Sequence, residues 1–162
     1  MNPPSLRHPV RAAIAAVVPV FIAGAGGSIV TAPAIPTWYA SLGKPWFTPP
    51  NWLFGPAWTL LYALMAYAFW RVLTLDRPLA DKRAAIAAWL VQAFFNGLWS
   101  VVFFGMRSPG GALIVIAAMW LAILANIIAF SRLDRTAAWL LAPYLAWTTY
   151  AAALNLGVYA LN

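Results

Sequence analysis

The sequence predicts an all-α integral membrane protein built as a bundle of five transmembrane helices. Its 162 residues are 64% hydrophobic and only 8% charged, whereas ordinary soluble domains carry about 25% charged residues. The charges fall in short patches, and five uncharged stretches each exceed the roughly 20 residues that a helix needs to cross a bilayer. A soluble protein of this size could not cover its surface with so few polar side chains, so the bilayer is its natural solvent.

The five expected helices follow from the uncharged stretches, which are residues 12–43, 45–70, 84–106, 108–131 and 136–162. Within a single domain, 1–162, we place helices at about 11–30, 51–74, 82–104, 110–130 and 136–159. The last three connections are short, so the helices that they join run antiparallel. The first connection, about residues 31–50, is long enough to cap the bundle. Pro19 and Pro143 predict kinks in the first and fifth helices.

The basic residues are divided unequally between the two ends of the predicted bundle. Eight lie on the side that holds the N-terminus, namely Arg7, Arg11, Arg71, Arg77, Lys82, Arg83, Arg132 and Arg135. Only Lys44 and Arg107 lie on the other side. The positive-inside rule therefore predicts a cytoplasmic N-terminus, with the long loop and the C-terminus outside. The basic side chains that give the chain its net charge of +7 lie at the ends of the predicted helices. Their expected partners there are anionic lipid headgroups rather than nucleic acid.

The sequence lacks the usual constellations of catalytic and metal-binding side chains. There is no cysteine, which excludes disulfides, thiol nucleophiles and iron–sulfur ligation. The single histidine, His8, precedes the first helix, and all three aspartates lie in connections on the N-terminal side. We therefore expect no metal site and no conventional catalytic residue. An ion-coupled pump would also lack its usual ionisable groups within the spans.

Polar side chains gather on one face of the third and of the fifth expected helix. At helical spacing, these faces are formed by Gln92, Asn96 and Trp99 and by Trp147, Ala151 and Asn155. Both faces should point into the bundle, because an unpaired amide is costly in hydrocarbon. Two interpretations of the amides remain open: hydrogen bonds between helices, or contacts to a bound ligand.

The tryptophans are of two kinds. Four lie near helix ends or at a depth that the lipid headgroups can reach, and most of these four are interpreted as belt residues: Trp70, Trp89, Trp120 and Trp139. Trp52, Trp99 and Trp147 differ, because the first opens the second helix beneath the long loop and the others lie on the polar faces. With Asn96 they can line one apolar cavity that the loop caps.

Three segments make the chain recognisable as a whole. They are WYASLGKPWFTPPNWLFGPAWTLLY over residues 38–62, QAFFNGLWSVVFFG over 92–105 and PYLAWTTYAAALN over 143–155. With the five-helix pattern, they resemble the tryptophan-rich sensory protein family, also called the translocator protein or peripheral-type benzodiazepine receptor family. The resemblance covers essentially the whole chain.

The resemblance implies a usually dimeric bundle that binds porphyrin- or haem-type tetrapyrroles beneath the first loop, as ligands rather than as an obligatory cofactor. Mitochondrial members also bind cholesterol and synthetic benzodiazepine or isoquinoline ligands. The motifs carry ligand-binding roles to Tyr39, Trp52, Asn96 and Trp147, and make Ala151 the small residue whose enlargement would narrow the cavity. Trp52 and Trp147 also match tryptophans implicated in the light-dependent degradation of porphyrin.

The resemblance leaves the purpose of ligand binding open. The protein is expected to be a carrier, sensor or scavenger of tetrapyrroles; the alternatives are a light-dependent porphyrin-degrading enzyme and a passive transporter of tetrapyrrole or sterol-like ligands. The proposed cholesterol motif of mitochondrial members requires a basic residue after its tyrosine, and none follows Tyr159 here. Helical spans suggest a bacterial inner membrane, although the family also includes outer-membrane and mitochondrial members.

Overall fold

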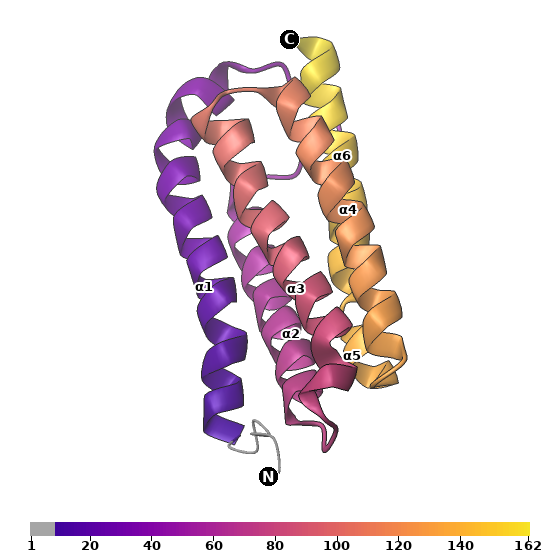
Figure 1. The fold of residues 1–162 in the computed structure, drawn as a ribbon. Helices are drawn as coiled ribbons and strands as arrows, with labels where there is room; N and C mark the ends of the chain where they lie inside the picture. The colour runs from indigo at the N-terminus through magenta and orange to yellow at the C-terminus, as the bar shows by residue number, and fades with distance from the viewer. Residues whose placement is uncertain (1–8) are drawn as a thin grey trace.

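The computed structural model describes residues 9–162 and confirms the predicted five-helix membrane bundle (Figure 1). Its helices are α1 (Pro9–Ala34), α2 (Phe54–Thr74), α3 (Leu79–Ser100), α4 (Pro109–Ser131), α5 (Arg135–Leu140) and α6 (Ala142–Leu161). Short helical turns, η1 (Ile35–Tyr39), η2 (Asn51–Leu53) and η3 (Val101–Gly105), extend three of them. Four of the helical stretches are long and apolar enough to cross a membrane, and α5 with α6 forms the fifth rod. Arg7 and His8 lie outside the described residues.

The helices pack around the bundle in an order that differs from their order in the sequence. α1 packs against α2 and α3, α3 against α4, α4 against α6, and α5 against α2. The start of α1 and the turns 75–78 and 132–134 lie at one end, which we call the N-terminal end (Figure 1). Residues 42–50, the turn 106–108 and the end of α6 lie at the other, which we call the loop end.

The first helix is longer than predicted, so the connection after it is shorter. α1 reaches Ala34 and continues through the π-helical turn η1, whereas the sequence placed a loop from about residue 31. Pro36 does not interrupt this continuation, because it lies at the start of η1, where a backbone N–H is not needed. The hydroxyl of Thr37 also donates to the carbonyl oxygen of Pro33 at 2.8 Å. The irregular connection is thereby reduced to residues 42–50.

The fifth rod is broken at Leu141, close to where Pro143 predicted a kink. α5 ends at Leu140 and α6 begins at Ala142, with the proline in its first turn. Proline is tolerated there because the first N–H groups of a helix have no partner within the helix. α1, in contrast, continues through Pro19.

The half of the bundle near the N-terminal end holds a closely packed apolar core. The rings of Phe69 and Trp89 stack with centroids 4.0 Å apart, and Trp89 is fully buried. The prediction that Trp89 belongs to a headgroup belt is therefore wrong: its side chain fills the space between α2 and α3. Trp139 on α5 is 76% exposed, which agrees with a position in the belt at the lipid headgroups.

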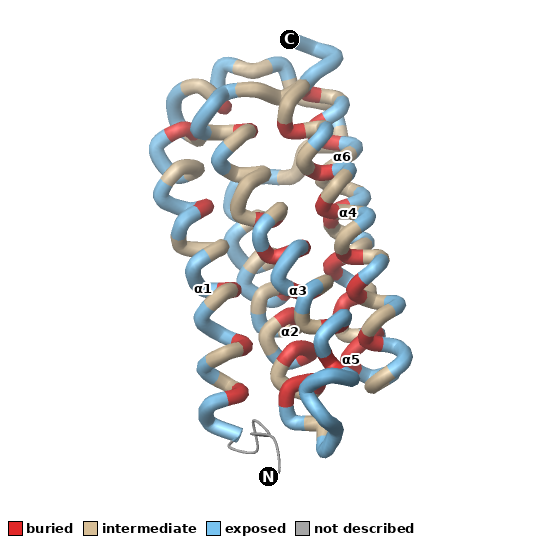
Figure 2. Tube along the Cα trace, viewed as in Figure 1, coloured by how far each residue is buried: buried red, intermediate tan, exposed pale blue. Residues whose placement is uncertain are grey.

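Much of the surface of α1 is not covered by the other helices. Figure 2 shows exposed residues along most of its length, with a narrow series of buried ones. The buried side chains include Ala12, Ala16 and Val20, which face the core near the N-terminal end. Nearer the loop end, α1 forms one wall of the cavity described below.

One ion pair fastens the turn between α4 and α5 to the end of α2. Arg71 Nε donates to Asp134 Oδ2 at 2.8 Å, while Asp134 Oδ1 accepts from the backbone N–H groups of Thr136 and Ala137 and so caps α5. Burial by itself raises the pKa of the Asp134 carboxyl. The hydrogen bonds from Arg71, Ala137 and Thr136 outweigh burial and hold this pKa below its ordinary value.

We expect Asp134→Ala to destabilise the bundle by about 1 kcal/mol more than Asp134→Asn, because asparagine still caps the helix while alanine does not. The ion pair itself contributes about 0–1 kcal/mol. The pKa of Asp134 is lower in the folded protein than in the unfolded chain. The carboxylate therefore contributes fully to the free energy of unfolding above about pH 4, and this contribution is lost as the pH falls through the pKa of the folded state.

Denaturant unfolding in detergent micelles, repeated from neutral to acidic pH, measures both effects. The difference in unfolding free energy between wild type and Asp134→Asn should shrink as the pH falls, because only the wild type loses this charge. A difference that stays constant down to about pH 3 would contradict the assignment.

Candidate functional site

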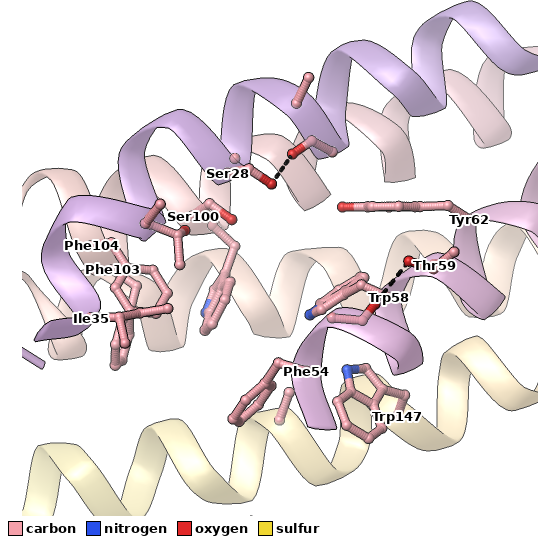
Figure 3. Close-up of a pocket in the computed structure, with 18 of the residues that line it drawn as sticks. Ser28, Ile35, Phe54, Trp58, Thr59, Tyr62, Ser100, Phe103, Phe104 and Trp147 are labelled. Carbon is pink, nitrogen blue, oxygen red and sulfur yellow. Dashed lines mark hydrogen bonds between the residues drawn. The ribbon is translucent and has the colours of Figure 1, made fainter. Parts of the chain in front are cut away.

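A cavity of about 710 Å³ opens in the half of the bundle near the loop end. Ligand pockets for small molecules commonly measure about 300–1,000 Å³. α2 and α6 pack together only slightly, and the cavity occupies the space between them. Its walls come from α1, η1, α2, the end of α3, η3 and α6 (Figure 3).

Aromatic rings form much of the cavity wall. The aromatic lining residues are Phe21, Tyr39, Phe54, Trp58, Tyr62, Trp99, Phe103, Phe104 and Trp147. Several contact one another: Trp99 and Phe103 stack at 5.1 Å between ring centroids, and Phe54 meets Trp147 edge to face at 6.1 Å. Rings held against rings make a rigid apolar wall that suits a flat aromatic ligand.

A chain of hydrogen bonds joins α2, α3 and α6 beneath the cavity. Tyr62 Oη donates to Asn96 Oδ1 at 2.9 Å, and Asn96 Nδ2 donates to Tyr144 Oη at 3.0 Å. Tyr144 Oη donates in turn to the sulfur of Met119 on α4 at 3.4 Å. Asn96 and Tyr144 are buried, so the amide pairs with phenols where water does not reach. This network fixes the floor of the cavity.

A second amide joins α6 to the end of α3 and the start of α4. Trp99 Nε1 donates to Asn155 Oδ1 at 3.1 Å, and Asn155 Nδ2 donates to the carbonyl oxygen of Pro109 at 2.8 Å. The indole of Trp99 is thereby held in place with its ring against the cavity. Asn155 thus serves as a link between helices.

The connection 42–50 is fastened to α6 at the loop end. Asn162 accepts from the backbone N–H of Gly43 and donates to its carbonyl oxygen, both at 3.0 Å. Tyr150 Oη donates to the carbonyl oxygen of Phe47 at 2.8 Å. A Cβ atom at Gly157 would lie 2.8 Å from the ring of Pro45, so only glycine permits this close approach. The connection is therefore held tightly against α6 at the loop end, beyond the residues that line the cavity, and we call it the roof.

Two indole N–H groups at the cavity wall remain free for a ligand. Neither Trp58 Nε1 nor Trp147 Nε1 has a hydrogen-bond partner among the described residues, and Figure 3 shows both side chains on the cavity. The ring of Trp58 is supported by Tyr62 at 5.3 Å and that of Trp147 by Tyr150 at 5.7 Å. These N–H groups can donate to a polar edge of an otherwise apolar ligand.

The cavity wall itself carries no charged side chain among residues 9–162. The nearest cation to the wall that we identify belongs to Lys44, whose Nζ lies 4.7 Å from the ring centroid of Tyr39 and donates to the carbonyl oxygens of Ala40 and Leu42. The same residues contain no cluster of three histidine, cysteine or carboxylate side chains that could hold a metal. A ligand of such a cavity would be selected by its shape, by aromatic contacts and by a few hydrogen bonds.

The structure brings four of the six predicted site residues to this cavity. Tyr39, Trp99, Trp147 and Ala151 line it. Asn96 does not line it but is bound to Tyr62, which does. Trp52 lies in η2, is 69% exposed and does not line the cavity. The structure thus separates Trp52 from the other predicted contacts.

Sequence reasoning missed the contribution of α2 to the cavity. Phe54, Trp58 and Tyr62 line it at i, i+4, i+8 spacing and so form one face of the helix. This aromatic series is visible in the sequence as a signal. The sequence analysis assigned the cavity contacts in this region to the long connection and to Trp52, and not to the rest of the second helix.

We expect Asn96→Ala to lower the free energy of unfolding by about 1–3 kcal/mol, because it leaves the hydroxyl groups of Tyr62 and Tyr144 without their amide partner. Denaturant unfolding in detergent micelles measures the change. Thr149→Val is a matched control, because it removes the exposed hydrogen bond from Trp120 and should shift stability by about 0.5 kcal/mol or less. Equal losses for the two variants would contradict the assigned role of Asn96.

Comparison with known proteins identifies the family of this chain. Residues 15–161 match the pattern of the TspO/MBR family. The chain is 40% identical over 149 residues to the tryptophan-rich protein TspO of Archaeoglobus fulgidus, covering 92% of this chain and 95% of that protein. It is 42% identical over 144 residues to the tryptophan-rich sensory protein of Cereibacter sphaeroides, covering 88% and 89%. It is 35% identical over 119 residues to the translocator protein of Homo sapiens, covering 73% and 70%. The chain belongs to the TspO/MBR family of membrane proteins.

Proposed function

We propose that this protein binds porphyrin- or haem-type tetrapyrroles within the membrane and acts as their carrier, sensor or scavenger. The observation that carries the proposal is the uncharged aromatic cavity of about 710 Å³, into which two indole N–H groups remain free to donate. Membership of the TspO/MBR family supports the same ligand class. The tetrapyrrole is a ligand here and not a resident cofactor.

The chemistry of the wall suits the two parts of such a ligand. A flat conjugated ring gains stacking and edge contacts from Trp99, Phe103 and Phe54. The polar edge of the ligand can accept from Trp58 Nε1 and Trp147 Nε1, while Lys44 beside Tyr39 supplies the positive charge that a propionate group requires. Sterol-like and synthetic aromatic ligands share the apolar part of this match.

We also propose an orientation for the bundle. Arg11, Lys82, Arg83 and Arg135 are among the basic residues at the N-terminal end, while the loop end carries Lys44 and Arg107. This bias favours a cytoplasmic N-terminal end. In a bacterial inner membrane, the roof then faces the periplasm.

We expect Trp58→Phe and Trp147→Phe each to weaken protoporphyrin binding by about three- to tenfold, because each removes one free donor worth about 0.5–1.5 kcal/mol while keeping an aromatic ring. Titrations followed by the absorbance of the porphyrin avoid changes in the tryptophan signal. Trp139→Phe is the matched control, since this side chain is 76% exposed on α5. Trp52→Phe should behave like the control, because Trp52 does not line the cavity.

Equal affinities for wild type, Trp58→Phe and Trp147→Phe would place the ligand elsewhere. A loss confined to Trp52→Phe would instead move the binding site to the exposed surface of η2.

Light-dependent degradation of the porphyrin is a second candidate function, favoured by the same two indoles on the cavity wall. An excited porphyrin carries the chemistry itself, so the absence of acid–base residues is no obstacle. Under illumination, wild type should bleach bound protoporphyrin about twofold or more faster than the Trp58→Phe/Trp147→Phe double variant. Dark samples and free tryptophan at equal concentration are the controls. Bleaching no faster than with free tryptophan would contradict a protein-catalysed reaction.

A further inference from the structure

The walls of the cavity differ in how far they are covered by other parts of the protein. On the side of α3 and α6 the lining is largely enclosed, and its buried members are Phe103, Leu154, Asn155 and Val158. On the side of α1 and α2 seven lining residues are exposed. Toward the loop end from Tyr62 these are Ser28, Ala32, Gly55 and Thr59, and toward the N-terminal end they are Val17, Phe21 and Ala63. The cavity is therefore open on one side of the bundle, toward the surface that meets lipid.

The exposed side follows the seam between α1 and α2. These helices run antiparallel and touch where a Cβ atom at Gly24 would lie 2.7 Å from the ring of Tyr62. One helical turn is about 5.4 Å, so the next turn toward the loop end brings Ser28 level with Thr59. Figure 3 shows these two side chains beside the cavity, with Tyr62 next to them. Tyr62 thus marks the lower limit of the part of the exposed seam that lies toward the loop end.

The edges of this opening are suited to an apolar surrounding. Ser28 Oγ donates to the carbonyl oxygen of Gly24 at 2.8 Å, and Thr59 Oγ1 donates to that of Gly55 at 2.9 Å (Figure 3). Both hydroxyl protons are therefore used within their own helices, as hydrocarbon requires. The remaining exposed edge residues, Ala32 and Gly55, present no polar side-chain atom.

Two other routes into the cavity are obstructed. The roof is fastened to α6 through the two hydrogen bonds between Gly43 and Asn162 and the contact of Tyr150 with Phe47. The gap between α2 and α6 is bridged where the ring of Phe54 meets that of Trp147.

We propose that ligands enter and leave the cavity sideways from the bilayer, through the seam between α1 and α2 above Tyr62. This inference rests on the proposed function, and it specifies the ligand class further. The protein takes a largely apolar molecule already dissolved in the membrane, rather than one captured from water past the roof. The exposed glycine and alanine edges keep the passage wide.

Two glycines allow a direct test of the opening. A Cβ atom at Gly55 or at Gly26 would meet no atom within 4 Å, and both residues are exposed on helices, but only Gly55 lines the cavity. Gly55→Phe should slow both association and dissociation of protoporphyrin IX by about tenfold, because an obstacle in the path raises the barrier in both directions. Gly26→Phe should leave both rate constants unchanged. Stopped-flow mixing with the full chain in phosphatidylcholine vesicles measures them.

The roof can be locked in a separate experiment. A Cβ atom at Gly43 would lie 3.2 Å from Leu161 Cβ, close to the Cβ separation of about 3.5–4.5 Å in disulfides. Because the chain contains no cysteine, the Gly43→Cys/Leu161→Cys variant forms only this disulfide within one chain. The oxidised and reduced forms of this variant should bind protoporphyrin IX at the same rate, since the roof need not open.

The outcomes separate this proposal from the proposed function. Slower association in the oxidised form, or unchanged rate constants in Gly55→Phe, would overturn passage through the seam even with tight protoporphyrin binding. An absence of saturable binding in wild type would count against the proposed function. The same rate measurements with pyrene, an aromatic probe that dissolves in the bilayer, would then decide the route.

Discussion

The hydrogen-bond chain from Tyr62 through Asn96 to Tyr144 holds together the three helices that diverge above it. In hydrocarbon an amide or a phenol without a partner is costly, so these groups bind one another where α2, α3 and α6 meet. Toward the N-terminal end the helices stay in contact through stacked rings such as Phe69 and Trp89. Toward the loop end they separate around most of the residues that line the cavity.

The cavity also depends on how the loop end is closed. Asn162 binds both backbone polar groups of Gly43, and Gly157 lets the ring of Pro45 approach α6. With the floor and the roof both fixed, the uncovered upper part of α1 beside α2 is the side left for exchange with the membrane (Figure 2). A rigid cavity with one lateral opening fits a protein that handles molecules dissolved in lipid.

The sequence by itself determined the class of protein and most of its topology. The spacing of charges fixed five spans, because a charged side chain is expensive in the bilayer whatever the tertiary contacts. Helical periodicity placed Trp99 with Asn96 and Trp147 with Ala151 on inward faces, since 3.6 residues per turn is a property of the backbone. Proline marked the break near Pro143 for the same local reason.

Only the tertiary structure decided which inward side chains meet the cavity and which meet each other. Asn96 lies on the predicted face, yet its amide binds two tyrosines. Trp89 resembles a belt residue in the sequence but fills the core. Trp58 lines the cavity because α2 and α6 diverge at its level. Helical periodicity predicts the direction in which a side chain points, but it does not predict which residue that side chain contacts. The contacting residue depends on the distance between the helix axes, which is set by the packing of the whole bundle.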